Sequence, residues 1–208
     1  MIFAIPEKDI LTLITHQLHS FFLITEEEDL LINIKWASVI RKLEKCFSPN
    51  PNKYYHRDNE IFFNPYHSGQ YTIMLYLLSR ELFLGGNSLL ADRVYYLNKA
   101  LNGCDLFYEV ELPEYFSLDH PVGSVIGRAS YGNGFAFGQC CTVGNNKGIY
   151  PTLGKNVRMC ANSSIIGNCH VGNNVIIAAN SGIKDIDIPD NTIVFGHTPN
   201  NTFKSIIK

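Results

Sequence analysis

The 208-residue chain has little charge of either sign and no long apolar run. Charged residues make up 17% of it, and 17 Lys and Arg against 19 Asp and Glu leave a formal net charge of −2. Because no basic block is present to neutralise a row of phosphates, we expect no nucleic-acid partner. Apolar stretches such as 73–78 are far shorter than the roughly 20 residues of a membrane-spanning helix, so we expect no membrane insertion.

Cysteine spacing and the first ten residues indicate in which cellular compartment the protein works. The six cysteines include no C-x-x-C pair and match no zinc-site spacing, which favours free thiols in a reducing compartment. The start, MIFAIPEKDI, does not have the basic-then-apolar pattern of a signal peptide. We therefore predict a cytoplasmic protein. Cys140, Cys141, Cys160 and Cys169 are interpreted as packing residues of a repeat whose interior needs small side chains, with a thiol or metal cluster as the alternative.

The first half of the chain, residues 1–104, has the patterns of a helical domain. Thr25–Glu28 is a capping box, with a hydroxyl at the N-cap and a glutamate three residues later. Ser68 is expected to cap the third helix, and Gly85-Gly86 to end it with a left-handed residue. Pro and Asn residues begin an irregular, aromatic-rich connection over 49–66. We expect four helices, over residues 8–23, 25–45, 68–84 and 88–101.

From Asp105 onward the period of the apolar residues changes. Nine of the twelve steps between successive anchors are six residues long, which fits neither a helix nor an alternating strand. Gly follows many anchors and Asn crowds the turns, and both tolerate the positive φ that a tight corner requires. The anchors are Leu106, Leu112, Leu118, Ile126, Tyr131, Phe137, Val143, Leu153, Met159, Ile165, Val171, Ile177 and Ile183.

This pattern resembles the hexapeptide-repeat, left-handed parallel β-helix, in which three six-residue faces form one triangular coil and the anchors stack inside. Left-handed crossovers depart from the usual handedness of parallel strands, so the repeat itself has to justify the assignment. The anchors correspond to about four to five coils. We therefore predict an α+β chain, with a helical N-terminal domain over 1–104 and a left-handed β-helix over 105–208. Another β-solenoid is the alternative.

Two steps between anchors are longer than the rest, at 118–127 and 143–154, and interruptions of a rigid solenoid are where function is usually placed. Here the chain resembles the serine acetyltransferase family, over about residues 69–200. The segment from Leu118 through Asp119 and His120 to Gly127 is similar to the family segment that carries the catalytic base. The family also has an aspartate fifteen residues before that histidine, and Asp105 stands at this position.

The chemistry of acyl transfer agrees with what this resemblance implies. A base must remove the proton of the attacking hydroxyl near neutral pH, and the ordinary pKa of histidine suits that task. We expect His120 to be this base. A carboxylate on the other ring nitrogen would fix the tautomer, and we assign that role to Asp105, while Asp119 is expected to face the acceptor. The alternative is that His120 caps a corner and Asp119 is a turn residue.

A second family signature, an Arg-His-Pro run that helps hold serine, is replaced here by Ile149-Tyr150-Pro151 in a loop about four residues shorter. This removes a guanidinium able to bind a carboxylate with two hydrogen bonds, and leaves Lys147 as a point charge. Tyr150 offers a phenol and an aromatic face, which suit a sugar ring or a neutral polyol at least as well as serine. Asp58 is aligned loosely with the family's serine-contacting aspartate in the helical domain.

The resemblance also implies the donor and the assembly. Members of this superfamily bind the pantetheine arm of coenzyme A between neighbouring β-helices of a trimer, largely through main-chain groups. Cys160, Ala161 and Ala179 are candidates for that wall, although small residues also simply suit a corner. Lys184, together with Lys204 and Lys208, is a candidate contact of the nucleotide phosphates. We expect a homotrimer, and leave open whether the helices pair trimers into hexamers.

We predict an acetyl-CoA-dependent O-acetyltransferase that acts on a hydroxyl of a small molecule or a sugar. A serine O-acetyltransferase of cysteine biosynthesis and a non-catalytic trimeric scaffold are the alternatives. No metal is expected, because His120, His170 and His197 lie 50 and 27 residues apart, unlike the zinc-binding histidines of γ-class carbonic anhydrases, which share the β-helix.

Overall fold

The computed structural model describes residues 1–206, so the predicted phosphate contact of Lys208 lies outside the described residues. The chain divides into two compact units, Met1–Asn102 and Gly103–Lys208. The division falls two residues before the boundary that the sequence predicts. Among residues 1–206, no helix combines the length and the apolar character that a membrane crossing requires.

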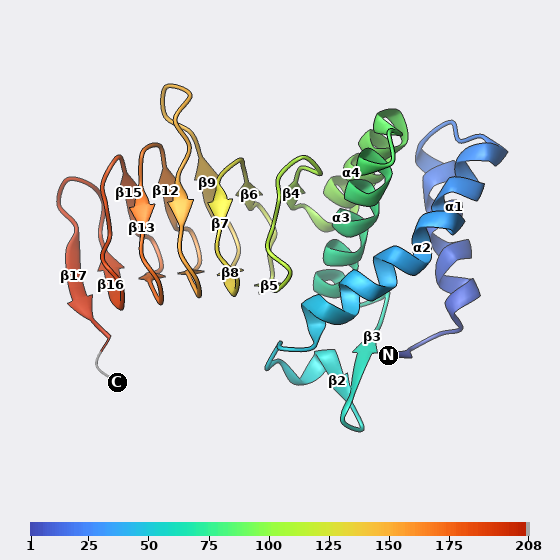
Figure 1. The fold of residues 1–208 in the computed structure, drawn as a ribbon, viewed down its shortest axis with the longest axis horizontal. Coiled ribbons are helices and arrows are strands. Elements are labelled where there is room, and N and C mark those ends of the chain that lie inside the picture. The colour runs from blue at the N-terminus through green and yellow to red at the C-terminus, as the bar shows by residue number, and fades with distance from the viewer. Residues whose placement is uncertain (207–208) are drawn as a thin grey trace. The chain divides into compact units, whose positions relative to one another are not determined.

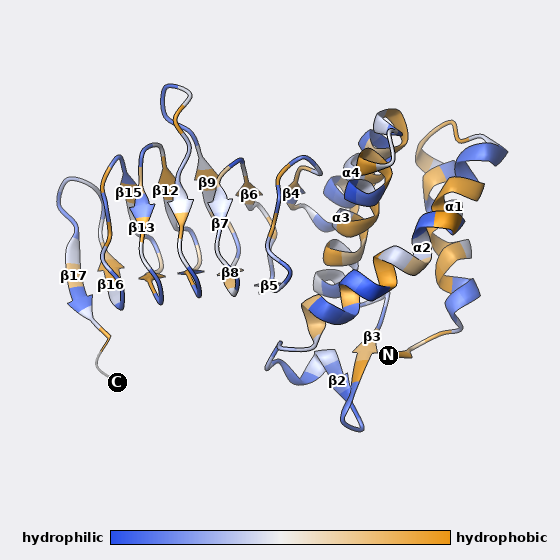
Figure 2. Cartoon of the chain, in the orientation of Figure 1, coloured by the Kyte–Doolittle hydropathy of each residue, from blue (hydrophilic) through white to orange (hydrophobic). Residues whose placement is uncertain are grey.

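The first unit is built on four helices, as predicted. Their ends lie within two residues of the expected ones, and Figure 2 shows hydrophobic stripes beside hydrophilic ones along α1 and α2. The capping box at the start of α2 is formed, since Thr25 Oγ1 accepts from Glu28 N at 3.3 Å and Glu28 Oε2 accepts from Thr25 N at 3.0 Å. The helices are α1 (Glu7–Phe21), α2 (Glu26–Phe47), α3 (Ser68–Leu84) and α4 (Ser88–Asn102).

The predicted cap of α3 is wrong by one residue. His67 is the N-cap, because its ring Nδ1 accepts a hydrogen bond from Gln70 N at 3.3 Å, and Ser68 is the first helical residue. At the other end, Gly86 supplies the left-handed conformation, with φ +83°, while Gly85 keeps a negative φ of −83°.

The connection over 49–66 is more regular than the sequence suggests. It contains a short 3-10 helix and an antiparallel hairpin, and the first strand of the chain pairs in parallel with the hairpin's second strand. Asp58 and Asn59 form the two-residue turn, with φ of +51° and +63°. The elements are β1 (Ile2–Phe3), η1 (Lys53–Tyr55), β2 (His56–Arg57) and β3 (Glu60–Phe63).

The second unit is a left-handed parallel β-helix of about five turns, as predicted. Figure 1 shows its short strands stacked coil upon coil, ending in β17, which pairs antiparallel with β16. Its three faces are a five-stranded sheet, a six-stranded sheet and a three-stranded sheet. The five-stranded sheet has β4 (Asp105–Leu106), β6 (Val125–Ile126), β9 (Thr142–Gly144), β12 (Ser164–Ile166) and β15 (Gly182–Lys184). The six-stranded sheet has β5 (Phe116–Leu118), β8 (Phe135–Phe137), β11 (Arg158–Met159), β14 (Ile176–Ile177), β16 (Thr192–Phe195) and β17 (Thr202–Ser205). The three-stranded sheet has β7 (Ser130–Tyr131), β10 (Thr152–Leu153) and β13 (His170–Val171).

The predicted anchors fill the interior of these coils. All are buried except Tyr131, which is half-buried, and Leu112 is buried without lying in a strand. Anchors from successive coils stack in register, as in the pairing of Ile165 with Val143 on one side and Ile183 on the other. Such stacking of apolar side chains supplies the main stabilisation of a solenoid.

Two of the four repeat cysteines pack in the interior as predicted. Cys141 and Cys169 are buried, and burial raises the pKa of the Cys169 thiol. Cys160 is only half-buried, and Cys140 is exposed, because it occupies a corner of the coil with φ +54°, so the predicted interior position of Cys140 is wrong.

Candidate active site

His120 lies in an enlarged corner of the β-helix. Six residues, 119–124, connect β5 on the six-stranded face to β6 on the five-stranded face. The later corners along the same edge, 138–141, 160–163 and 178–181, each use four. The first corner therefore contains a two-residue insertion.

The inserted residues form a tight bulge. Val122 N donates to His120 O at 2.8 Å and Ser124 N donates to Pro121 O at 3.1 Å, so the segment closes on itself. Cys140 N donates to Val122 O at 3.0 Å, which places Gly123, with φ +77°, in the regular corner position. His120 is left outside the stack.

The His120 backbone is in the left-handed region, at φ +48°, which is uncommon for a residue other than Gly, Asn or Asp and is frequent at functional sites. Its side chain is exposed. Among residues 1–206, no side chain hydrogen-bonds its ring. Both ring nitrogens are thus open to a substrate and to an orienting carboxylate.

Asp105 lies on β4, in the strand next to the end of the bulge. Its backbone N donates to Ser124 O at 2.8 Å, and it pairs in register with Val125. The side chain is half-buried. The fold thus brings Asp105 to the segment that follows His120, while no hydrogen bond or ion pair joins the two side chains within the described residues.

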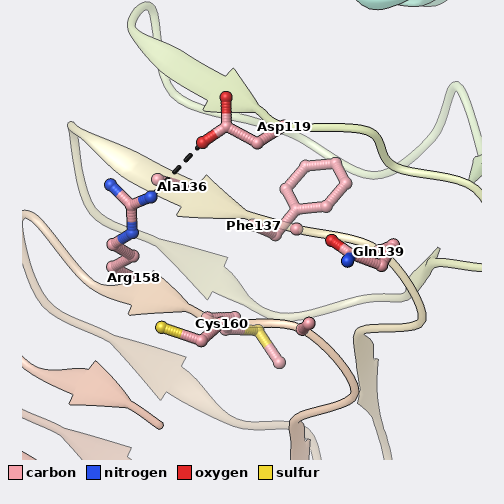
Figure 3. Close-up of a pocket in the computed structure, with 9 residues that line it drawn as sticks. Asp119, Ala136, Phe137, Gln139, Arg158 and Cys160 are labelled. Carbon is pink, nitrogen blue, oxygen red and sulfur yellow. Dashed lines mark hydrogen bonds and ion pairs between the residues drawn. The ribbon is translucent and has the colours of Figure 1, made fainter. Parts of the chain in front are cut away.

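Asp119, which directly follows β5, borders a hollow of about 140 Å³ over β8 and β11. Figure 3 shows its carboxylate turned toward the guanidinium of Arg158, and the two groups approach to 3.3 Å between Oδ2 and Nη2. The remaining lining residues are Ala136, Phe137, Gly138, Gln139, Met159, Cys160 and Ala161. A candidate acceptor contact, Asp119, and two candidate donor contacts, Cys160 and Ala161, therefore line one hollow.

The other candidate donor residues are placed differently. Ala179 lies one coil beyond Ala161 along the same edge, where Asn180 N donates to Ala161 O at 3.0 Å. Lys184 lies at the far end of β15, beside Asp185 at the next corner. The fold thus gathers Cys160, Ala161 and Ala179 along one edge and leaves Lys184 at another.

Tyr150 lies on a hairpin at a different corner, between β9 on the five-stranded face and β10 on the three-stranded face. Asn146 and Ile149 exchange two backbone hydrogen bonds of 3.0 Å across Lys147 and Gly148, which have φ of +51° and +80°. Figure 1 shows this loop projecting beyond the neighbouring corners. Tyr150 is 44% exposed. Within one chain, Tyr150 and His120 thus stand at opposite edges of the five-stranded face.

The hairpin is tied to the coil below it by Asp185. Asn146 Nδ2 donates to Asp185 Oδ2 at 2.5 Å, and Asn168 N donates to Asp185 Oδ1 at 2.8 Å. The hydrogen bond from Asn168 N lowers the pKa of Asp185, with further contributions from the Asn146 amide and from Lys184 and Lys147.

Asp58 belongs to the first unit. It is exposed at the β2–β3 turn and borders a hollow of about 400 Å³ with Lys53, His56, Arg57 and Asn59. Its assignment to the acceptor stays a prediction.

His170 and His67 have structural partners. His170 Nδ1 lies 2.9 Å from Asp187 Oδ1 on the surface of β13, and His67 caps α3. Among residues 1–206, no three His, Cys, Asp or Glu side chains are grouped so as to hold a metal ion.

Sequence reasoning missed Arg158. Its signal was available, because it directly precedes the anchor Met159 and outward positions of one face stack across coils. The register that brings it near Asp119 depends on the insertion after Leu118 and on the long hairpin, and the repeat alone does not fix it.

Comparison with known proteins places the chain among acetyltransferase relatives. No protein-family model matches it. It is 25% identical over 146 residues to a serine acetyltransferase of Staphylococcus epidermidis, covering 62% of this chain and 63% of that protein. The chain thus spans less than two thirds of that relative's length.

Solved structures agree with the sequence match. Neisseria gonorrhoeae serine acetyltransferase in complex with serine superposes with a TM-score of 0.65 at 25% identity, covering 82% of this chain and 71% of that one. The chain is serine acetyltransferase-like in sequence and fold. A serine acetyltransferase solved in complex with CoA also shares the fold. It superposes with a TM-score of 0.67 at 18% identity, covering 86% of this chain and 74% of that one.

Proposed function

We propose that the chain transfers the acetyl group of acetyl-CoA to the hydroxyl of L-serine. The observation that carries the proposal is the bulged corner, which leaves the exposed His120 outside the stack of coils, next in sequence to Asp119, which borders the hollow. The main prediction from the sequence left the acceptor as any small molecule or sugar. The relatives are serine acetyltransferases, and they favour the serine alternative.

The proposed chemistry is a direct attack in a ternary complex. The His120 imidazole accepts the proton of the serine hydroxyl as its oxygen bonds to the thioester carbonyl. The tetrahedral intermediate then collapses, the carbon–sulfur bond breaks, and the imidazolium returns the proton to the CoA sulfur. Asp105 acts on the other ring nitrogen, where it fixes the tautomer and stabilises the imidazolium. The required contact between Asp105 and His120 forms on substrate binding in this proposal, because catalytic hydrogen bonds often tighten only in the bound state.

The donor is assigned to the edge formed by Cys160, Ala161 and Ala179. Small side chains there leave backbone groups accessible to a thin pantetheine chain, and the edge continues from the hollow that Asp119 borders. CoA binding by a solved relative supports this assignment.

A complete site in this proposal needs more than one copy of the chain. His120 and Tyr150 stand at opposite edges of one face, so a neighbouring copy must supply the hairpin if both contact one acceptor. We therefore retain the homotrimer, whose mass light scattering would measure as three times 23.4 kDa, while six copies would indicate a hexamer. The six free cysteines support a reducing compartment, and we propose the cytoplasm.

A neutral hydroxyl acceptor is the second candidate. The observation in its favour is the hairpin itself, where Tyr150 presents a half-exposed ring and Lys147 is the cation of the turn. A sugar ring stacks on such a surface without needing a carboxylate partner.

The test is release of CoA thiol from acetyl-CoA by the purified protein, with L-serine compared against a panel of sugars and nucleotide sugars. We expect turnover with L-serine and a loss of about 10²- to 10⁴-fold in kcat for His120→Ala. His170→Ala is the matched control, since His170 is an exposed histidine beside a carboxylate outside the hollow. A protein that releases no CoA with any acceptor and binds no acetyl-CoA by calorimetry would be a scaffold and not an enzyme.

A further inference from the structure

The β2–β3 turn of the first unit borders a hollow of about 400 Å³, and Figure 1 shows this turn projecting from the rest of the unit. We propose that this hollow, called the β2–β3 hollow below, binds a phosphorylated sugar or polyol. The cations of its wall bind the phosphate group, and the turn binds the hydroxyl groups. The inference goes beyond acetyl transfer and does not depend on it. The lining residues are Lys53, His56, Arg57, Asp58 and Asn59.

An aromatic ring holds Arg57 in place. Its guanidinium carbon lies 3.8 Å from the centroid of the Phe62 ring, and Phe62 is only 7% exposed, so the ring is a fixed support. A guanidinium stacked on a ring keeps the N–H groups of its edge for other partners. Arg93 and Arg128 each pair with a glutamate, whereas no carboxylate among residues 1–206 pairs with Arg57. Its donors are therefore free for a ligand.

A second cation comes from a different element. Lys53 begins η1, and its ammonium nitrogen lies 5.2 Å from the centroid of the Tyr54 ring, with no carboxylate partner in the described part of the chain. His56 lines the same wall, where its Nε2 donates to Asn50 O at 2.8 Å and fixes the ring. A phosphate monoester carries a charge of about −1.5 to −2 at pH 7, so it matches two cations. The fork of a guanidinium also fits phosphate oxygens with two parallel hydrogen bonds.

The turn itself supplies groups for hydroxyls. Asp58 and Asn59 are exposed and have φ of +51° and +63°. A carboxylate accepts hydrogen bonds from hydroxyl groups, and an amide both accepts and donates them. Asp58 would repel an isolated phosphate ion, so this set of groups favours a phosphate that is attached to a polyol. The volume of the hollow lies in the range of small-molecule sites. In this proposal Asp58 binds the phosphorylated ligand and not the acceptor.

The experiment is a calorimetric titration of the full chain without acetyl-CoA. The probes are D-glucose 6-phosphate, inorganic phosphate and D-glucose. Arg57→Gln and Lys53→Gln each remove one cation, from β2 and from η1. Arg41→Gln is the matched control, because Arg41 is an exposed arginine on α2 of the same unit and does not line the hollow. The melting temperature of each variant shows that its fold is kept, and Lys53→Gln decides if Arg57→Gln unfolds the turn.

We expect D-glucose 6-phosphate to bind wild type more tightly than inorganic phosphate does, and D-glucose to bind least. Arg57→Gln should weaken the binding of D-glucose 6-phosphate about 10-fold or more, because hydrogen bonds between charged groups are lost. Lys53→Gln should weaken it about fivefold, since an ammonium acts as a point charge, and Arg41→Gln should stay within about twofold. D-glucose 6-phosphate that binds no better than D-glucose, or an equal loss in Arg41→Gln, would overturn the inference.

Asp58→Gly tests the recognition of hydroxyl groups, because glycine tolerates the positive φ of this position. The preference for D-glucose 6-phosphate over inorganic phosphate should fall at least about fivefold, since one hydrogen bond of a charged group to the sugar is lost. An unchanged preference would overturn the assignment of the sugar to the turn.

These titrations and the CoA-release assay fail independently. A wild type that binds D-glucose 6-phosphate and releases no CoA with any acceptor would overturn the proposed function alone. A wild type that acetylates L-serine and does not bind D-glucose 6-phosphate would overturn this inference alone.

Discussion

Corners along the same edge of the β-helix use a residue in the left-handed conformation in two different ways. At the later corners, Asn162 and Asn180 have φ of +57° and +55°, and Asn162 Nδ2 donates to Asn180 Oδ1 at 2.8 Å. Their side chains hold the stack together. At the first corner, two extra residues let Gly123 keep the regular position and put His120 outside the stack at φ +48°. A solenoid can therefore release one side chain for chemistry without disturbing the coils beyond it.

A second histidine shows that an acidic partner alone does not make a site. His170 contacts Asp187 at 2.9 Å, and hydrogen bonds from the His170 side chain and backbone N lower the pKa of Asp187. This pair lies on a regular coil, 64% and 75% exposed, and lines none of the hollows described above. The two-residue insertion distinguishes His120.

The contrast between His120 and His170 predicts its largest effect on activity at Asp105. Asp105→Asn should lower kcat by about 10²-fold or more with L-serine, because an amide cannot stabilise the imidazolium. Asp187→Asn, which changes the carboxylate beside His170, should leave kcat within about twofold. Steady-state kinetics measure both, and equal activity of the two variants would remove Asp105 from the mechanism.

The regular coils should be far less tolerant of added volume than the projecting hairpin. A Cβ at Gly132 would lie 2.2 Å from the backbone O of Gly154, whereas a Cβ at Gly148 would meet nothing within 4 Å. We expect Gly132→Ala to lower the free energy of unfolding by about 3 kcal/mol. Gly148→Ala should cost about 1 kcal/mol, from its positive φ. Chemical denaturation measures both values, and equal losses would contradict the distinction.

The stability of the later corners should depend on which residue occupies the left-handed position. Asn162→Ala keeps a β-carbon in the left-handed region without the polar side chain that lets Asn adopt it, and also removes the amide hydrogen bond to Asn180, so it should cost about 1–2 kcal/mol. Asn162→Gly loses the same amide bond but tolerates the backbone conformation, so its cost should be smaller. Thermal unfolding of the two variants separates the two causes. A glycine variant that is less stable than the alanine variant would show that backbone conformation does not govern the corner.

The smallest expected effect concerns acid stability at the hairpin. Because the folded pKa of Asp185 is lowered, its stabilisation is present above the unfolded value of about 3.9 and is lost as the pH falls through the folded pKa. Asp185→Asn should therefore have a melting temperature that falls less steeply than that of wild type below about pH 4. Parallel acid dependence of the two proteins would mean that Asp185 does not hold the hairpin through its charge.

The six-residue repeat made the β-helix predictable, and local helix signals such as the capping box made much of the first unit predictable. The six-residue period placed the anchors inside, and the capping box at Thr25 placed the start of α2. The connection over 49–66 was predicted less well, because its short strands depend on pairing with β1, sixty residues away in sequence.

The candidate site was predictable in part. The sequence singled out Asp105, Asp119 and His120 through their resemblance to a family motif, and it could not supply Arg158. That contact joins residues 39 apart and depends on the number of residues inserted at two corners. Register across coils is a tertiary property, which the period of one strand does not determine.

The central claim is that two extra residues turn a structural corner into a catalytic one. It is tested most directly by deleting Pro121 and Val122, which restores a six-residue step from Leu118, and by measuring CoA release with L-serine. The control is Pro121→Ala/Val122→Ala, which keeps the length. We expect the deletion variant to keep its melting temperature and to fall to the kcat of His120→Ala, while the length-preserving variant should stay within about threefold of wild type. A deletion variant that turns over like wild type would contradict it.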